Sequence, residues 1–284
     1  MHPITVKTYN DNMYSPADNG KYKYYLFFEA GHISSVIADE QNQQVMCMKV
    51  FTGEQVNFLA LSYDEFKQIT PLLDDMSNKY KEIRVVISNS ACALVPEALL
   101  NVIETEAYYN LNHKSIPQSQ VLYCKMHVQH TACIFNIRNE LVKLIRFNLP
   151  LVDVNHASLL FIKAIEQQNF EQSASKIHLY VHSSYIELLN FDKGIKFYNT
   201  FHFENEDEIV YYLLAAAENL QISHGLDVLL YGNLPIVSVL HEILAKYVRS
   251  VQFGIKPKKL TYPVAFNQFA EHQFFIESSA LLCE

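Results

Sequence analysis

The feature that most constrains the fold of this chain is an order of secondary-structure elements that occurs twice. In each half, three runs rich in β-branched and aromatic residues are separated by polar turns, as expected of an antiparallel meander. Each meander is followed by a capped helix, a strand and a helix that begins at proline. A constant shift along the chain places Leu26 on Leu179 and Asp39 on Asp192. We therefore predict two related α/β halves, although two unrelated α/β units would give a similar pattern.

Turn residues bound the expected strands. In the first half these strands are Lys23–Glu29, His32–Ala38, Val45–Phe51 and Ile83–Ser88. In the second half they are Ile177–Val181, Tyr185–Phe191, Ile195–Phe203, Leu226–Tyr231 and Ser250–Phe253. Asp192-Lys193-Gly194 joins two of these strands and is a hairpin signal.

Helix starts are marked in both halves. Ser62 with Glu65 forms a capping box, and an apolar face follows it as far as Leu73. Asn205 precedes three acidic residues, which favour the positive end of a helix dipole. Pro96 and Pro235 each suit the first position of a helix.

These signals predict four segments in the chain. Residues 1–21 are polar and are expected to form a loosely held lead-in. Residues 22–172 would form an N-terminal lobe with an inserted subdomain at about 106–150, and residues 173–253 a C-terminal lobe. The tail, 254–284, contains four phenylalanines and is too apolar to be free. We expect it to pack on the body of the protein, with docking on a partner chain as the alternative.

Composition excludes several classes of protein. Of the 284 residues, 50% are hydrophobic and 18% are charged, which is wrong for a disordered chain. The net charge of −8 argues against a nucleic-acid surface, which needs a concentrated basic face. No apolar run is long enough to span a bilayer, and the N-terminus lacks the apolar core of a signal peptide. Five irregularly spaced cysteines suggest reduced thiols, and so we expect a cytoplasmic protein.

Glycine is scarce. The chain has 7 glycines, where an average chain of this length would have about 20. Loops that wrap phosphates rely on glycine, because its small size lets backbone N–H groups approach the anion. Neither a Walker A motif nor a G-x-G-x-x-G motif is present.

The order of elements, taken with several short segments, resembles the actin-like ATPases. These segments are Leu94–Glu97, Ile116-Pro117, Arg138–Leu141, Asp207–Leu213 and Tyr231–Asn233. The run Arg138-Asn139-Glu140-Leu141 after a strand is similar to the inserted subdomain of pilus-assembly and cell-division members. The segments also resemble an uncharacterised bacterial family of unknown function that has this fold. The resemblance implies a duplicated RNase H-like α/β fold, with two lobes whose mixed sheets each begin with a three-strand meander.

The resemblance also implies three loops around a nucleotide in the cleft between the lobes. The first normally reads Asp-x-Gly and here reads Glu29-Ala30-Gly31, so its acid is one methylene longer. The second, again Asp-x-Gly, is His182-Ser183-Ser184 and has lost both acid and glycine. The third, normally a glycine pair, is Gly232-Asn233-Leu234. Glu29, Gly31, His182, Ser183, Gly232 and Asn233 are therefore the candidate nucleotide-binding residues, in loops that are largely degenerate.

Two other patterns in the sequence contain residue types that could carry chemistry. Cys124, His127, His130 and Cys133 have metal-type spacing, but in a hairpin the two cysteines lie on one face and the two histidines on the other. We therefore expect no metal site there. Ser183 beside His182 does not form a nucleophilic dyad, because adjacent strand residues point to opposite faces. No catalytic residue is predicted.

These observations favour a non-catalytic scaffold or interaction protein that binds no cofactor and has an unidentified protein partner. The alternative is a divergent ATPase or small-molecule kinase that binds Mg-ATP between the lobes. A structural protein with an unrelated small-molecule pocket is a third hypothesis. If the tail folds back, it could cover a face that active members use for a ligand.

Overall fold

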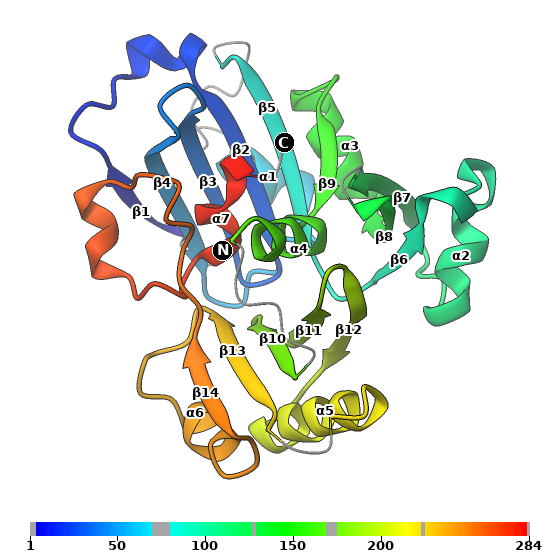
Figure 1. Cartoon of the computed structure of the whole chain (residues 1–284). Helices are drawn as coiled ribbons and strands as arrows, with labels where there is room; N and C mark the ends of the chain where they lie inside the picture. Colours follow the sequence, from blue (N-terminus) through cyan, green and yellow to red (C-terminus); the bar gives the residue numbers. More distant parts are fainter. Residues whose placement is uncertain (1–3, 70–79, 127–128, 169–174, 223–224, 283–284) are drawn as a thin grey trace. The chain divides into compact units, whose positions relative to one another are not determined.

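The computed structural model describes residues 4–69, 80–126, 129–168, 175–222 and 225–282 (Figure 1). The chain divides into two compact units. The first contains Met1–Leu159 and Lys258–Gln268, and the second contains Leu160–Pro257 and Phe269–Leu282. The C-terminal tail therefore contributes one segment to each unit.

The first unit is built on a six-stranded sheet with the order β1-β4-β3-β2-β5-β9. Its strands are β1 Ile4–Asn10, β2 Lys23–Glu29, β3 His32–Asp39, β4 Gln44–Gly53, β5 Glu82–Ser88 and β9 Asp153–His156. The predicted meander is confirmed, because β2, β3 and β4 pair antiparallel. β5 lies parallel to β2, and β9 lies parallel to β5. The central strand β2 is buried from Lys23 to Phe28, as expected of a strand covered on both faces.

The edge strand β1 corrects the expectation of a loosely held lead-in at residues 1–21. It pairs with β4 along its whole length, from Ile4 opposite Gly53 to Asn10 opposite Cys47. Most of its side chains are exposed, and so its sequence has little hydrophobic periodicity. Backbone hydrogen bonds to β4, rather than apolar burial, hold this strand on the sheet.

Helix α1, Tyr63–Ile69, begins at the predicted capping box. The backbone N–H of Ser62 donates to Oε2 of Glu65 at 2.8 Å, and the N–H of Glu65 donates to Oγ of Ser62 at 3.3 Å. These two hydrogen bonds confirm the predicted start. The expected continuation of the helix to Leu73 lies outside the described residues.

A three-stranded sheet in the first unit has the order β6-β8-β7. Its strands are β6 Cys92–Pro96, β7 Ser119–Met126 and β8 Thr131–Arg138. Helix α2, Thr105–Asn112, packs on one face of this sheet, where Tyr109 contacts a core formed with Val95 and Ile134. Helix α3, Asn139–Asn148, follows β8 directly.

Pro96 does not open a helix, as the sequence had suggested. It is the last residue of β6, and a 3-10 turn, Glu97–Leu99, follows it. β6 is an edge strand whose only sheet neighbour among the described strands is β8. A proline is tolerated at an edge because the missing N–H faces away from the ladder. The small sheet therefore begins before the subdomain boundary predicted near residue 106.

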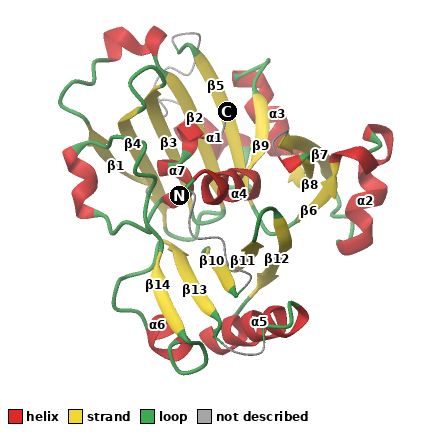
Figure 2. Cartoon of the chain, viewed as in Figure 1, coloured by secondary structure: helices red, strands yellow, loops and turns green. Residues whose placement is uncertain are grey.

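The second unit contains a five-stranded sheet with the order β12-β11-β10-β13-β14 (Figure 2). Its strands are β10 Lys176–Val181, β11 Tyr185–Phe191, β12 Ile195–His202, β13 Asp227–Gly232 and β14 Ser250–Phe253. The first three pair antiparallel, and β13 and β14 add in parallel. This order repeats that of β4-β3-β2-β5-β9 in the first unit, which confirms the predicted duplication.

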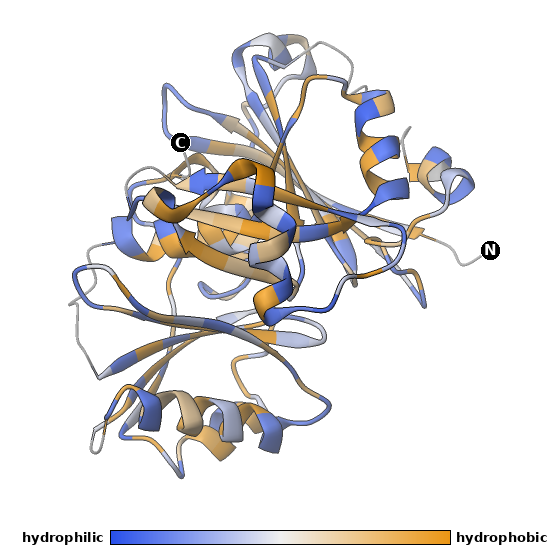
Figure 3. Ribbon diagram, turned by 90° about the vertical axis from the view of Figure 1, so that its right-hand side faces the viewer, coloured by the Kyte–Doolittle hydropathy of each residue, from blue (hydrophilic) through white to orange (hydrophobic). Residues whose placement is uncertain are grey.

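The two faces of this second sheet differ in chemistry. One face is aliphatic: Leu179 and Leu230 belong to a core that includes residues of α5, Glu206–Asn219, and α6, Val239–Leu244. The other face carries the aromatic rings of Tyr180 and Tyr231. They pack against Phe161 of α4, Ala157–Gln167, and Tyr231 also packs against Phe275 of α7, Phe275–Ser278. Figure 3 shows hydrophilic and hydrophobic residues alternating along the helices, as expected of helices with one buried face.

The helix starts of the second unit agree with the sequence at one position and differ at the other. The side chain of Asn205 accepts from the N–H of Glu208 at 3.1 Å and caps α5, as predicted. Pro235, in contrast, does not open α6. Ser238 is the cap, accepting from the N–H of His241 at 3.1 Å. A hydroxyl that bonds a free helix N–H outweighs the preference of proline for the first turn.

The tail segments are held in different ways. In the first unit, the N–H of Val45 donates to the carbonyl of Thr261 at 2.9 Å, and the N–H of Thr261 donates to Gln43 at 3.0 Å. In the second unit, Phe275 and Leu281 are buried. No helix in the described part of the chain is long and apolar enough to cross a bilayer.

Candidate functional site

The first candidate loop lies at the turn between β2 and β3. Glu29 is the last residue of β2 and is half-buried, whereas Gly31 is exposed. Glu29 lies in register with Ser88 at the carboxyl end of the parallel strand β5. Ligands of open α/β sheets bind beyond the carboxyl ends of the parallel strands. The turn that keeps an acid and a glycine therefore lies at the carboxyl edge of the sheet, where ligands bind in folds of this kind.

The second candidate loop is the turn between β10 and β11. The N–H of His182 donates to the carbonyl of Tyr185 at 2.9 Å, which closes a tight turn. Ser183 and Ser184, at the tip of this turn, are exposed, whereas His182 is buried. The serine hydroxyls and the imidazole therefore point to different environments, as predicted when a dyad was excluded.

The side chain of His182 belongs to a buried polar network. Its Nε2 atom lies 2.8 Å from Oε1 of Glu187, and the hydroxyl of Tyr198 donates to Oε2 of Glu187 at 2.8 Å. The side chains of His182 and Glu187 are 1% and 0% exposed. The imidazole also stacks on Tyr185, with ring centroids 4.0 Å apart. The acid in this part of the fold is thus oriented toward a histidine and a tyrosine inside the protein.

The third candidate loop follows β13. Gly232 has φ of 110°, and a Cβ at this position would overlap the carbonyl oxygen of Val181. Glycine is therefore required here for backbone geometry, whether or not a ligand binds. Gly232 also pairs with Val181 in the parallel register of β13 and β10. This register brings His182 and Ser183 next to Gly232 and Asn233 at one edge of the second sheet.

The C-terminal tail hydrogen-bonds to the third loop within the second unit. The N–H of Gly232 donates to the carbonyl of His272 at 3.1 Å. The carbonyl of Leu234 accepts from Nε2 of His272 at 2.8 Å and from Nε2 of Gln273 at 3.1 Å. Burial lowers the pKa of His272, the hydrogen bond to Leu234 opposing it. His272 thus bonds to the loop that would otherwise offer its backbone to a ligand, while the side chain of Asn233 is exposed.

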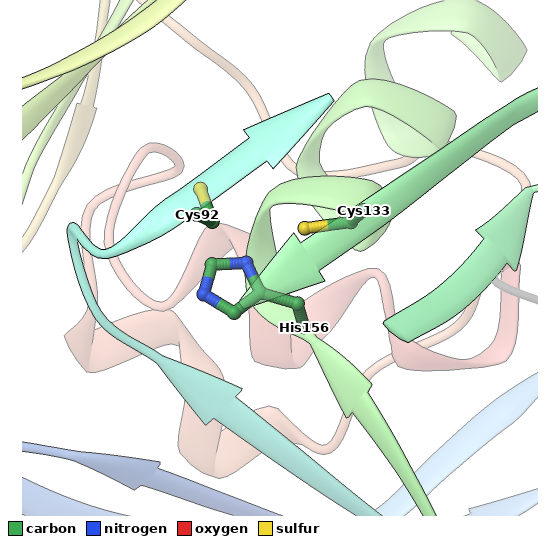
Figure 4. Close-up of side chains that lie close together, drawn as sticks. All are labelled: Cys92, Cys133 and His156. Atoms are coloured by element: carbon green, nitrogen blue, oxygen red, sulfur yellow. The ribbon is translucent and has the colours of Figure 1, made fainter. Parts of the chain in front are cut away.

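The structure also brings together a group of residues that the sequence analysis missed. Cys92, Cys133 and His156 are all buried, and one donor atom from each lies within 4.8 Å of the others (Figure 4). The predicted pairing of Cys124 opposite Cys133 is confirmed. The metal-type spacing in the sequence includes Cys133 but neither Cys92 nor His156, because these two residues are distant from it in the chain. The signal that could have found them is the repeated placement of cysteine on inward-facing strand positions.

The histidines of the original four-residue pattern do not join this group as far as the structure describes them. The side chain of His130 is 85% exposed and lies 3.9 Å from a carboxylate oxygen of Glu97. His127 lies outside the described residues. Burial raises the pKa of the Cys133 thiol, and its hydrogen bond to Cys124 lowers the pKa of Cys124.

Comparison with known proteins identifies the family. Residues 11–251 match the model of the family described as "Protein of unknown function (DUF3822)". The chain belongs to this family. No curated protein matches the sequence.

Solved structures show the fold. A protein of unknown function with an actin-like ATPase fold from Bacteroides thetaiotaomicron has a TM-score of 0.76 and 18% identity, covering 96% of this chain and 100% of the other. A chain of the PilM–PilN type IV pilus biogenesis complex has a TM-score of 0.60 and 12% identity, covering 92% and 97%. The predicted actin-like α/β fold and the predicted likeness to pilus-assembly proteins are therefore confirmed. At these identities the likeness concerns the fold alone.

Proposed function

We propose that this DUF3822 protein is a non-catalytic scaffold or interaction protein that keeps the actin-like fold without using nucleotide hydrolysis. The observation that carries this proposal is the buried pair of His182 and Glu187, at the turn where an Asp-x-Gly loop would serve a nucleotide. Both carboxylate oxygens of Glu187 accept hydrogen bonds from protein groups. A carboxylate engaged in this way is not offered to a metal-bound water.

The third loop supports the same proposal. Its glycine is demanded by the close approach of Val181, and its neighbouring carbonyl bonds to side chains of the tail. Phosphate loops work by directing free backbone N–H groups at an anion. In this loop the N–H of Gly232 already donates to His272. A nucleotide would have to displace the tail in order to use it.

A protein partner fits this role better than a small-molecule substrate. One similar structure is a chain of a two-protein complex, PilM–PilN. We propose by analogy that the DUF3822 chain also acts by binding another protein, and not nucleic acid, given its net charge of −8. We expect this to occur in the cytoplasm, since Cys47, Cys92, Cys124 and Cys133 carry free thiols.

The rival function, a divergent ATPase or kinase, has one observation in its favour. Glu29 and Gly31 keep an acid and a small residue at the carboxyl edge of the first sheet. A single acidic turn would give weak Mg-ATP binding at best, because the other two loops contain no acid and the N–H of Gly232 already donates to His272. Mg-ATP therefore stands as the alternative cofactor.

Thermal unfolding with and without Mg-ATP tests the proposal. A ligand at 100 times its dissociation constant stabilises a protein by about 2.7 kcal/mol, which is easily seen as a rise in Tm. We expect no rise in the intact chain, and no phosphate release above that of buffer. A clear rise that Glu29→Ala abolishes and Glu54→Ala, an exposed acid of the same unit, does not would overturn the scaffold proposal.

A further inference from the structure

The group of Cys92, Cys133 and His156 lies far in sequence from the loops discussed above and takes no part in the proposed function. Cys92 opens β6, Cys133 is in the middle of β8, and His156 ends β9. Their exposed fractions are 5%, 0% and 0%. In Figure 4 a ring nitrogen of His156 points toward the two sulfur atoms. The donors converge on one point although they come from three strands.

Strand register explains why the thiols share a face. Leu94 pairs with Cys133, and so Cys92, two residues before Leu94, projects to the same side of the small sheet. Cys124 lies directly opposite Cys133 on β7 and joins this side. The opposite side of the sheet packs against α2. Three cysteines from three neighbouring strands are therefore gathered on the face that meets His156.

A third thiol and a serine complete the surroundings. Cys124 is hydrogen-bonded to Cys133 and interacts with both His156 and Cys92. The hydroxyl of Ser158 lies 3.5 Å from Sγ of Cys92, and the N–H of Ser158 donates to Nδ1 of His156 at 3.3 Å. The ring of Phe135 lies against the imidazole, with centroids 5.0 Å apart. The donors thus sit in an enclosed, ordered environment.

We propose that Cys92, Cys124, Cys133 and His156 bind one zinc-class metal ion as a closed structural site. Thiolate and imidazole are the ligands that zinc prefers, and a Cys₃His set is a common structural arrangement. Zinc–sulfur bonds of about 2.3 Å separate tetrahedral donors by about 3.8 Å. The donor atoms of Cys92, Cys133 and His156 lie within 4.8 Å of one another, so these three require only small movements of the side chains. Cys124 is placed as the fourth ligand by its hydrogen bond to Cys133. Binding replaces the thiol protons with the ion, so that each proton leaves to solvent.

The site would join two parts of the first unit. His156 belongs to the six-stranded sheet, whereas the three cysteines belong to the three-stranded sheet. An ion held between them would fix the small sheet to β9 without any contribution from the candidate nucleotide loops. The proposal departs from the sequence-based expectation of no metal, which considered only donors close together in the chain.

Metal titration of the intact, reduced chain tests the proposal. After treatment with a chelator, the protein is titrated with Zn²⁺ against a chromophoric chelator and, separately, with Co²⁺. We expect one ion per chain and a thiolate-to-cobalt charge-transfer band in the near ultraviolet. Cys92→Ser should lower zinc affinity at least about 100-fold, since loss of even an outer partner of a metal ligand can reach that factor.

Cys47→Ser is the matched control. Cys47 is also a buried free cysteine of the first unit, but it lies on β4 outside the group. Its substitution should leave zinc stoichiometry and affinity unchanged. The proposal is overturned if the two serine variants bind zinc equally. It is also overturned if the wild-type chain shows no thiolate–cobalt band, a measurement that depends on no variant.

Discussion

The turn between β2 and β3 and the turn between β10 and β11 occupy the same position in two sheets with the same strand order, yet they differ in chemistry. The first presents Glu29 and Gly31 at a partly exposed edge. The second folds His182 inward onto Glu187 and leaves only two serines at its tip. The same strand order in the two sheets therefore does not give their equivalent turns the same function. Side chains determine whether the polar groups of a loop remain available to a ligand or bond to the protein itself.

The cost of burying polar groups explains why this difference matters. A buried carboxylate is tolerated only when its oxygens are hydrogen-bonded. Glu187 meets that requirement through His182 and Tyr198. Once such a network forms, it stabilises the fold only while it stays complete. The second turn has thus become part of the core, whereas Glu29 in the first turn is only half-buried.

Among the substitutions that test this difference between the two turns, we expect His182→Ala to lower the free energy of unfolding most. The substitution leaves Glu187 buried with one of its two partners, and we expect a loss of about 3–5 kcal/mol in the free energy of unfolding. Glu29→Ala, at the equivalent turn of the first unit, should lose less than about 1 kcal/mol. Urea unfolding of both full-length variants measures the difference. Equal losses would mean that the two turns are not distinguished by burial.

Glycine substitutions test whether the backbone of the third loop and that of the first turn differ in the same way. Gly232→Ala forces a Cβ into the carbonyl of Val181 at a φ of 110°, and we expect a loss of at least about 2 kcal/mol. Gly31 is not among the described glycines with positive φ, and so Gly31→Ala should change stability by less than about 0.5 kcal/mol. Thermal midpoints of the two variants give the test. A silent Gly232→Ala would contradict the steric account.

A pH effect extends the comparison to the strands that precede the two turns. The constant shift that relates the halves places His178 of β10 where β2 has Tyr25. Burial, with a smaller effect of Lys176, lowers the pKa of His178 to about 3. The unfolded chain, with a histidine pKa near 6.5, takes up the proton first, so stability falls as the pH drops from about 6.5 toward 3.

Between pH 7 and pH 5 this single group should reduce the free energy of unfolding by about 2 kcal/mol. His178→Gln removes the titration and should flatten the profile over that interval, as measured by urea unfolding at each pH. His130→Gln, at an exposed turn of the first unit, serves as the control and should keep the wild-type slope. An unchanged slope in His178→Gln would assign the acid sensitivity to other groups.

The predictable parts of the fold are those with local signals. Alternating apolar residues located both meanders, and side-chain caps located α1 at Ser62 and α5 at Asn205. The two errors in helix position have a local explanation as well. Pro96 and Pro235 suit a helix start, but they also suit an edge strand and a loop. The exposed edge strand β1 carried almost no signal, because its stability comes from pairing with β4.

The candidate sites show the same division. The hairpin pairing of Cys124 with Cys133 followed from spacing, but the contribution of Cys92 and His156 did not. Likewise, the loss of acid and glycine at residues 182–184 could be read from the chain, but the bond from His182 to Glu187 could not. Residue identity alone does not say which polar groups are buried together.

Local composition and periodicity were thus sufficient for the α/β class of the fold and its duplication, whereas the degeneration of its loops followed from the family that the sequence resembles. They are properties of short segments, and short segments carry them in any context. The inward network at His182, the tail bonded to Gly232 and the donors around Cys133 each depend on segments far apart in the chain. Such contacts arise from strand register and burial, since these bring distant residues within bonding distance only after the chain has folded.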